Sequence, residues 1–223
     1  MITETRRLFN DNILEHALTH WGVSPADSKQ LGGFESFVYE FTRDGHSYIM
    51  KLAHDVRRTA DYIMGELDFV NYLADHGVTT PRAVESIFGE LTHTIPAPDG
   101  SNFVACVFQK APGQRLRKAD LTDELYVSWG RLIGRMHRLT RDYTPSNHAW
   151  RRQHWHQDEE LDFARWLPED DAEIIAAGER ILSHLKSLPT PPDAYGLIHE
   201  DAHPGNFFLH NGTIWLFDFD DCQ

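Results

Sequence analysis

The chain has 223 residues, of which 41% are hydrophobic and 25% are charged. That length is enough for one large domain or for two small lobes, each with its own core. The formal net charge of −13 disfavours nucleic acid as a partner, because phosphate backbones are bound by basic patches. It is compatible with a cationic substrate, although solubility alone would also explain it.

Cysteine content and hydropathy bear on the compartment. Cys106 and Cys222 make neither a disulfide framework nor a CxxC pair, which favours free thiols in a reducing compartment. Residues 1–10 are polar and lack the apolar core of a signal peptide. The sequence has no stretch of 18 apolar residues, so we expect a cytoplasmic protein that makes no use of a membrane.

The first half of the chain predicts an antiparallel sheet with one inserted helix. Residues 4–21 are predicted to form a preceding helix, because their apolar side chains recur at helical spacing. The inserted helix, 59–76, is expected to stop at Gly77, shortly before Pro81. Strands are expected on both sides of a glycine turn within 31–41, and at 47–52, 83–88 and 103–109.

The second half is predicted to be mainly helical. Helices are expected at 121–139, near 158–166 and at 169–187. This change in character divides the chain into a first lobe at 1–105, a hinge at 106–113 and a second lobe at 114–223. The expected fold class is therefore α+β, with a sheet-rich lobe followed by a mainly helical lobe that contains a hairpin.

Asn211-Gly212 lies between two apolar runs near the C-terminal end, a strong signal for a β-hairpin with a two-residue turn. The expected register pairs His210 with Thr213, Leu209 with Ile214, Phe208 with Trp215, and Phe207 with Leu216. Asn206 and Asp218 then emerge side by side at the open end, about 5 Å apart as cross-strand neighbours are. An amide oxygen and a carboxylate at that separation could share a hard cation such as Mg²⁺.

Asp201 precedes this hairpin on the loop that enters it. The Pro204-Gly205 turn could bring its carboxylate near the same ion, placed to orient a substrate hydroxyl and accept its proton. Asp and Asn are also common in turns for their own hydrogen bonds. The combination His-x-Asp-x-x-x-x-Asn, a hairpin and Asp-Phe-Asp nevertheless indicates phosphoryl transfer, which needs metal ligands and a positioned base.

The segment 199–206, His-Glu-Asp-Ala-His-Pro-Gly-Asn, resembles the catalytic loop of the aminoglycoside phosphotransferase and choline kinase-like family. Asp218-Phe219-Asp220 resembles that family's metal-binding motif, the counterpart of Asp-Phe-Gly in protein kinases. The resemblance implies a protein kinase-like fold that uses ATP and Mg²⁺. It further implies Asp201 as the catalytic base, His199 as a brace for the loop, and Asn206 and Asp218 as metal ligands.

The same resemblance extends to the first lobe. Lys51, which closes the strand Tyr-Ile-Met-Lys, would contact the α- and β-phosphates, and Glu66 on the next helix would hold it. Gly32 and Gly33 would let backbone N–H groups approach the phosphates, with Ser36 in support. A single lysine on a strand or a Gly-Gly turn is, on its own, weak evidence for nucleotide binding. The segment 103–111 resembles the hinge that binds adenine through its backbone.

Two departures from the family pattern stand out. Glu200 occupies the position where the family usually has glycine, and its charge could raise the pKa of Asp201 or simply point away. The family also usually continues for several helices beyond the Asp-x-Asp motif, whereas this sequence stops at Gln223. We therefore expect a fragment, a truncated gene product, or a pocket completed by a second chain.

The function that best fits these patterns is ATP- and Mg²⁺-dependent transfer of the γ-phosphate to a hydroxyl of a small molecule. The alternative is a nucleotide-binding regulatory pseudokinase without a complete acceptor site, and a protein kinase ranks below both. A metal site at His154 and His156 is a further alternative, but histidines in a polar loop more often face solvent. Trp150 and Trp155 are expected to pack the helical lobe rather than line a substrate pocket.

Overall fold

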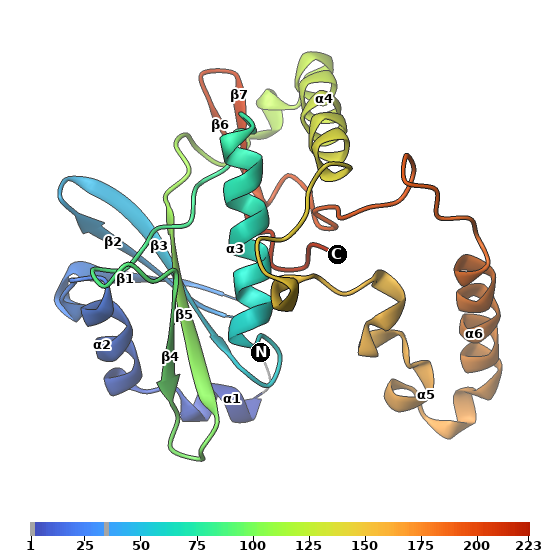
Figure 1. Cartoon of the computed structure of the whole chain (residues 1–223), viewed down its shortest axis with the longest axis horizontal. Helices are drawn as coiled ribbons and strands as arrows, with labels where there is room; N and C mark the ends of the chain where they lie inside the picture. Colours follow the sequence, from blue (N-terminus) through green and yellow to red (C-terminus); the bar gives the residue numbers. More distant parts are fainter. Residues whose placement is uncertain (1–2, 34–35) are drawn as a thin grey trace.

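The computed structural model describes residues 3–33 and 36–223. Its main sheet has five antiparallel strands in the order β1-β2-β3-β5-β4 (Figure 1). They are β1 (Ser28–Gly32), β2 (Phe37–Arg43), β3 (His46–His54), β4 (Thr92–Pro96) and β5 (Asn102–Gln109). Asp44 and Gly45 both have positive φ in the tight turn between β2 and β3, the conformation that such a two-residue hairpin requires.

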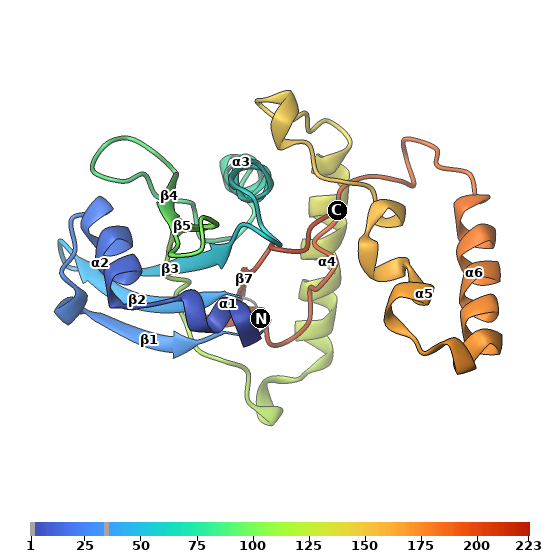
Figure 2. The ribbon, with the colours of Figure 1, turned by 90° about the horizontal axis from the view of Figure 1, so that it is seen from below.

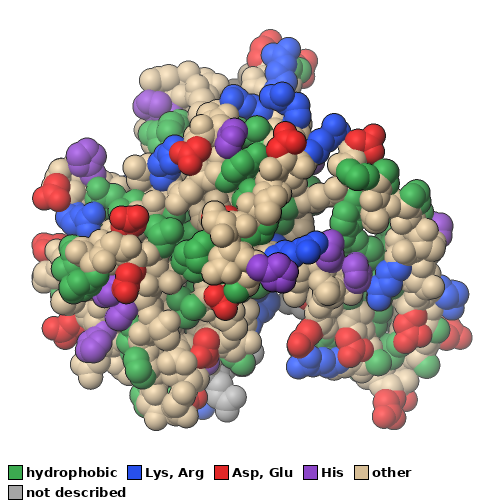
Figure 3. Space-filling model, in the orientation of Figure 1, with side chains coloured by type: hydrophobic (Ala, Val, Ile, Leu, Met, Phe, Trp, Pro, Cys, Tyr) green, Lys and Arg blue, Asp and Glu red, His purple; other side chains and the backbone are tan. Residues whose placement is uncertain are grey.

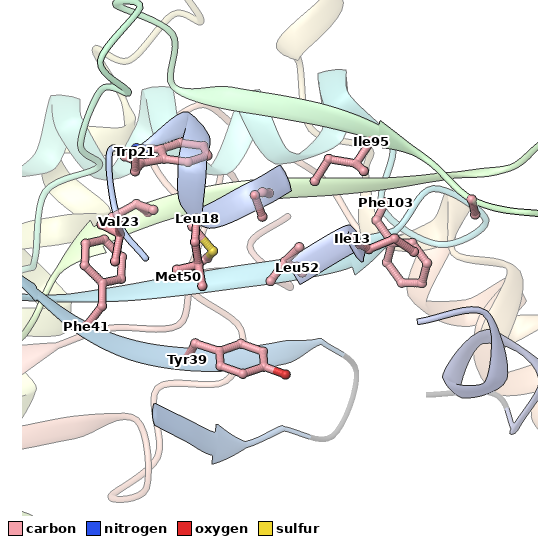
Figure 4. Close-up of a cluster of buried hydrophobic side chains, with 14 residues drawn as sticks. Ile13, Leu18, Trp21, Val23, Tyr39, Phe41, Met50, Leu52, Ile95 and Phe103 are labelled. Carbon is pink, nitrogen blue, oxygen red and sulfur yellow. The ribbon is translucent and has the colours of Figure 1, made fainter. Parts of the chain in front are cut away.

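Side chains alternate between the two faces of β3, so the strand separates two environments. Met50 and Leu52 are fully buried on one face, in a core formed with α2 (Figure 4). Lys51 and Ala53 lie on the other face, which α3 (Ala60–Asp75) covers. Figures 1 and 2 show α2 and α3 on opposite sides of the sheet.

The predicted helix over 4–21 is wrong as a single element. It consists of α1 (Thr3–Leu8) and α2 (Asp11–His20), which are separated because Asn10 caps the second helix. The Asn10 side chain accepts hydrogen bonds from the backbone N–H groups of Asn12 and Ile13. An N-cap residue has extended backbone geometry, so the helix cannot run through it.

The predicted strand over 83–88 is also wrong, and the strand β4 further along was missed. Ala83 forms only an isolated bridge with Phe108. The chain then turns, because the Ser86 hydroxyl accepts from the backbone N–H groups of Phe88 and Glu90. A side chain that satisfies local backbone donors competes with the hydrogen bonds of a sheet, and here the turn forms in place of a strand.

The rest of the chain is mainly helical, as predicted, and ends in a hairpin. Its α-helices are α4 (Asp123–Thr140), α5 (Phe163–Trp166) and α6 (Ala172–Lys186). Short 3-10 turns lie at Pro25–Asp27, Lys118–Asp120, His148–Trp150, Trp155–Gln157, Glu159–Leu161 and Glu169–Asp171. The helix expected near 158–166 is therefore one 3-10 turn followed by the single turn α5. The hairpin strands are β6 (Phe207–His210) and β7 (Thr213–Leu216), paired in the predicted register.

The α3 helix packs on the sheet and on the second half of the chain at once. Its residues Phe69, Val70 and Leu73 are buried in one cluster with Phe207 and Leu216 of the hairpin. A hydrogen bond from the Leu216 N–H to the Thr79 carbonyl, 3.0 Å long, ties β7 to the segment after α3. This packing fixes the open end of the hairpin relative to β3.

Acidic and basic side chains are interspersed on the face of the molecule shown in Figure 3. Within residues 3–33 and 36–223, no helix combines the length and the apolar character that crossing a bilayer requires.

We expect Gly65→Ala to destabilise the fold. A Cβ at Gly65 in α3 would overlap the carbonyl oxygen of Trp150, which crosses the helix at this point. Overpacking of this kind costs about 1–3 kcal/mol, more than the gain in helix propensity. Gly130→Ala in α4 is the matched control, because a Cβ there meets no atom within 4 Å. Urea unfolding should show a lower midpoint for Gly65→Ala alone; equal midpoints would contradict the close approach.

Candidate active site

A cavity of about 450 Å³ lies where the sheet, α3 and the residues after β7 meet. Most of the predicted site residues line it, together with Asp220, an acidic residue that was not assigned a role. These are Gly32, Gly33, Ser36, Lys51, Glu66, Asp201, Asp218 and Asp220. The other two predicted residues, His199 and Asn206, lie behind this lining and act on it through hydrogen bonds described below.

Lys51 is the centre of the charge arrangement in this cavity. Its Nζ lies 3.0 Å from Asp218 Oδ1, 3.4 Å from Glu66 Oε1 and 3.7 Å from Asp220 Oδ1. Only 13% of the Lys51 side chain is exposed, and Glu66 is almost completely buried. The pairing of Lys51 with Glu66, inferred from the family resemblance, is present alongside two further carboxylates.

These contacts decide the charge state of the cluster. Burial by itself lowers the pKa of Lys51, but the carboxylates of Asp218, Glu66 and Asp220 outweigh it, so the net pKa lies well above its usual value. Burial, joined by the charges of Asp220 and Asp218, raises the pKa of Glu66 against the opposing effect of Lys51. The ammonium is therefore held firmly in its charged form, within a surplus of acidic groups.

Asp220 carries the second cation contact of the cavity. Its Oδ2 accepts a hydrogen bond from Arg58 Nε at 3.0 Å. Burial raises the pKa of Asp220, yet Lys51 and Arg58 more than compensate, and the net pKa is lowered. Asp220 is thus ionised and shared between two cations, one from β3 and one from the segment before α3.

Asp201 and Asn206 are held together at the entrance to the hairpin. Asn206 Nδ2 donates to the backbone oxygen and to Oδ2 of Asp201, both at 2.9 Å. Because both bonds use the amide nitrogen, the amide oxygen of Asn206 is available to a cation. The Phe217 N–H donates to the Asn206 carbonyl at 2.9 Å, so the predicted pairing continues beyond β6 and β7.

His199 links the segment 199–206 to the segment after β7. Its Nε2 donates to the Phe217 carbonyl at 3.1 Å, and its ring packs against Phe219 with centroids 4.2 Å apart. Burial lowers the pKa of His199. The imidazole is therefore neutral at neutral pH and supports the backbone that carries Asp218, without lining the cavity.

Glu200 has φ of 67°, in the left-handed region that favours glycine. The geometry explains why glycine would suit this position, since a non-glycine residue there costs about 1–2 kcal/mol. The Glu200 side chain lines a second cavity of about 870 Å³, next to the end of α4 and the segment around Trp155. Consecutive residues Glu200 and Asp201 therefore belong to different cavities.

Arg152 was missed by sequence reasoning, although it organises the site. Its guanidinium donates to the carbonyls of Cys222 at 2.7 Å, Tyr62 at 2.8 Å and Asp220 at 2.5 Å. It thereby ties the segment after Asp218 to α3, the helix that carries Glu66. Arg152 lies in an irregular aromatic stretch without periodicity, so no local pattern identifies it; Asp220, in contrast, was visible in the Asp-Phe-Asp motif.

His154 in the same stretch donates to or accepts from the Tyr195 hydroxyl at 2.9 Å and stacks on His156. These contacts give His154 a structural role. The metal-binding interpretation of this loop gains nothing from them.

Comparison with known proteins identifies the chain. Residues 28–223 match the model of the phosphotransferase enzyme family. The chain belongs to the phosphotransferase enzyme family. Amicoumacin kinase of Bacillus subtilis (strain 168) is 35% identical over 219 residues, which are 98% of this chain and 65% of that kinase. The chain thus spans just under two thirds of that relative's length.

Two solved structures extend this result to the fold of the phosphotransferase. Amicoumacin kinase hAmiN, in complex with AMP-PNP, Ca²⁺ and Ami, superposes with a TM-score of 0.95 at 35% identity, covering 100% of this chain and 67% of that one. The microcompartment-associated aminopropanol kinase superposes with a TM-score of 0.74 at 25% identity, and the match covers 96% of this chain and 70% of that one. The predicted family and its kinase-like fold, an antiparallel sheet followed by a helical lobe, are confirmed.

We expect His199 to make the stability of this protein depend on pH. Its folded pKa lies below the ordinary 6.5, so the unfolded chain binds more protons as the pH falls. Stability should be fully present above about pH 6.5 and be lost below it, by at most about 1.4 kcal/mol per pH unit. Urea unfolding from pH 7.5 to 5.5 should show this slope reduced in His199→Gln.

His93 also has a lowered pKa, but it contributes equally to both proteins in that comparison. The difference between the two slopes therefore reports His199 alone. Identical slopes would show that the ring is not held neutral by its surroundings.

Proposed function

We propose that this protein binds ATP and Mg²⁺ and transfers the γ-phosphate to a hydroxyl group of a small molecule. The observation that carries the proposal is the shared cavity of Lys51, Asp201, Asp218 and Asp220. Phosphoryl transfer requires little covalent work from the protein; it requires a positioned base, a cation for the phosphates and oxygen ligands for a metal. Family membership and the likeness to two small-molecule kinases support the same reaction.

The nucleotide would lie between β1, β3 and the end of β5. Gly32 and Gly33 have positive φ, which exposes backbone N–H groups in a loop that side chains would otherwise cover. Phe108 and Ala111 line the same cavity, and we propose that the adenine meets the backbone there. We propose accordingly that 106–113 forms the hinge between lobes at 1–105 and 114–223.

The donor set fits a divalent metal. Asp218 and Asp220 offer carboxylate oxygens, Asn206 offers an amide oxygen, and Mg²⁺ prefers oxygen ligands of this kind. Lys51 and Arg58 together do not balance the acidic side chains around them, so added positive charge is favourable here. A bound magnesium ion would neutralise negative charge on the phosphates; Asp218, Asp220 and Asn206 are the residues we assign to hold it.

The remaining steps belong to the protein's own side chains. Asp201 accepts the proton of the acceptor hydroxyl, and Asn206 keeps that carboxylate oriented through its amide hydrogen bond. Lys51 binds the α- and β-phosphates once they compete with Asp218 for its ammonium. Glu66 positions the Lys51 ammonium, and His199 supports the backbone that carries Asp218. Most of the acceleration then comes from orientation and charge compensation.

The acceptor substrate is proposed to be a small molecule that carries an amine. Amicoumacin kinase and aminopropanol kinase, the relatives described above, are named for substrates, and the second name specifies an amino alcohol. The net charge of −13 and the acidic lining of the active-site cavity favour such a cation. We place the acceptor hydroxyl beside Asp201, in the cavity that Asp218 and Asp220 also line.

The pseudokinase alternative has less support. A regulatory protein of that kind would have no need to retain the phosphate-binding lysine, the base and the metal ligands together. Lys51, Asp201, Asn206 and Asp218 are all retained and lie in hydrogen-bonded positions.

We expect Asp201→Asn to reduce phosphate transfer about 10²-fold or more, because an amide cannot accept the hydroxyl proton. Nucleotide affinity should stay nearly unchanged, since Asp201 is not among the residues that hold Lys51. A coupled assay of ADP release measures the first effect and calorimetry with a non-hydrolysable ATP analogue measures the second. Asp170→Asn, at an exposed aspartate remote from the cavity, is the matched control. Full activity of Asp201→Asn would remove this residue from the reaction.

A phosphate-transfer screen tests the acceptor class. Amicoumacin, 1-amino-2-propanol and choline should stimulate ATP consumption, whereas neutral sugars should not. Stimulation by the sugars alone would contradict the proposed amine. Slow ATP hydrolysis that no compound stimulates, together with tight nucleotide binding, would favour the pseudokinase instead.

A further inference from the structure

Three side chains with metal-binding atoms meet on the face of the sheet opposite the active-site cavity. His20 ends α2, His93 lies on β4, and Glu90 lies in the turn that precedes β4. One ligand atom from each lies within 4.8 Å of the other two. Figures 1 and 2 show α2 and α3 on opposite sides of the sheet, so this cluster is separate from the site at Lys51.

Backbone structure brings the three residues together. Ile95 of β4 packs into the core beneath α2 (Figure 4), and His93, two residues earlier, therefore lies on the same face of the strand. The turn before β4 is tied to the end of α2 twice. Trp21 Nε1 donates to the Val84 carbonyl at 3.0 Å, and the Ile87 N–H donates to the His20 carbonyl at 3.2 Å. These bonds hold Glu90 against the helix.

The His20 side chain already contacts both of the other two side chains. His20 Nε2 lies 2.8 Å from Glu90 Oε2, and the His20 and His93 rings stack with centroids 3.8 Å apart. Burial, followed by the neighbouring His20 and then offset in part by Glu90, lowers the pKa of His93. Neutral imidazole is the form that binds metals, so protons compete weakly at this position.

A fourth donor lies within reach. His16 is one helical turn before His20 and therefore on the same face of α2. Its charge contributes to the lowered pKa of His93, which places it in the same electrostatic neighbourhood. His16 is exposed, so its side chain can rotate toward an ion without breaking a packed core.

We propose that His20, Glu90 and His93 form a second metal site, which binds a divalent transition-metal ion of the zinc class. Two imidazoles and one carboxylate are a ligand set that Zn²⁺ uses, with His16 or water in the fourth position. Zinc–ligand bonds of about 2.0–2.2 Å require the three donor atoms to approach more closely than 4.8 Å, so the His93 ring, which now stacks on His20, has to turn out of the stack when an ion binds. Mg²⁺ prefers oxygen ligands, so the two sites would select different ions.

The ion would take the place of the proton shared by His20 and Glu90. It would then add direct bonds between α2, the turn and β4, which the His20–Glu90 contact and the His20–His93 stacking now connect alongside apolar packing. Anything that binds the folded state alone raises stability in proportion to its concentration and affinity. A zinc-dependent gain in stability of the N-terminal sheet is therefore expected, independent of whether phosphate transfer takes place.

The test is calorimetric titration of metal-free protein with zinc chloride at pH 7.5. Saturating Mg²⁺ and a non-hydrolysable ATP analogue are included, so that the active-site carboxylates are occupied. The wild-type protein should bind one equivalent of zinc. His93→Gln and Glu90→Gln should bind it at least about 10- to 100-fold more weakly, a loss that even outer-shell partners of metals can cause. Cobalt substituted for zinc should give the visible absorption of a tetrahedral site in the wild type but not in the His93→Gln and Glu90→Gln variants.

His46→Gln is the matched control, because His46 is an exposed histidine on β3 of the same sheet. It should bind zinc as the wild type does. Glu90 is largely exposed, so its substitution leaves the core intact and the comparison does not depend on a variant that fails to fold. Absence of zinc binding in the wild type, or equal binding in the His93 and Glu90 variants, would overturn the proposal.

Discussion

The Lys51 ammonium, buried among the carboxylates of Glu66, Asp218 and Asp220, is the interaction on which the rest of the site depends. It joins three elements that are distant in sequence: β3, α3 and the segment after the hairpin. Removing one partner from such a buried group typically costs about 3–5 kcal/mol, because an uncompensated charge remains. The cluster therefore fixes β3, α3 and the segment after the hairpin relative to one another. Its charged groups are also the ones that would exchange partners when phosphates and a metal bind.

A second layer of contacts keeps that arrangement in place. Arg152 donates to three backbone carbonyls that belong to α3 and to the segment after Asp218, and His199 donates to the carbonyl of Phe217, directly before Asp218. Arg58 shares Asp220 with Lys51. Since these groups touch backbone as much as side chains, displacement of α3 would move Glu66 and the Asp218 loop together. The position of α3 and the geometry of the residues around Lys51 are thus coupled through these hydrogen bonds.

The sequence predicted the hairpin register and the family because short-range signals specify them; of the cluster around Lys51, only the pair with Glu66 was inferred, from the family resemblance. Asn211-Gly212 sets the register by turn geometry alone, and the loop motif specifies residues at fixed offsets. It failed where a single side chain overrides a periodic pattern, as Asn10 does between α1 and α2 and Ser86 does in the turn before β4. Arg152 and the His20–Glu90–His93 cluster depend on contacts between distant elements, which no local pattern encodes. The roles of the site residues and the lobe boundaries stay predictions.

The most direct test of the central claim is calorimetric titration of wild-type protein and Lys51→Met with a non-hydrolysable ATP analogue in saturating Mg²⁺. Circular dichroism should first establish that the variant is folded at the titration temperature. A charge-assisted hydrogen bond is worth about 1.5–3 kcal/mol, which corresponds to a loss in affinity of about 10- to 100-fold. The account predicts a loss of that size for Lys51→Met. Equal affinity in the two proteins would contradict it, because the buried ammonium would then have no part in binding the phosphates.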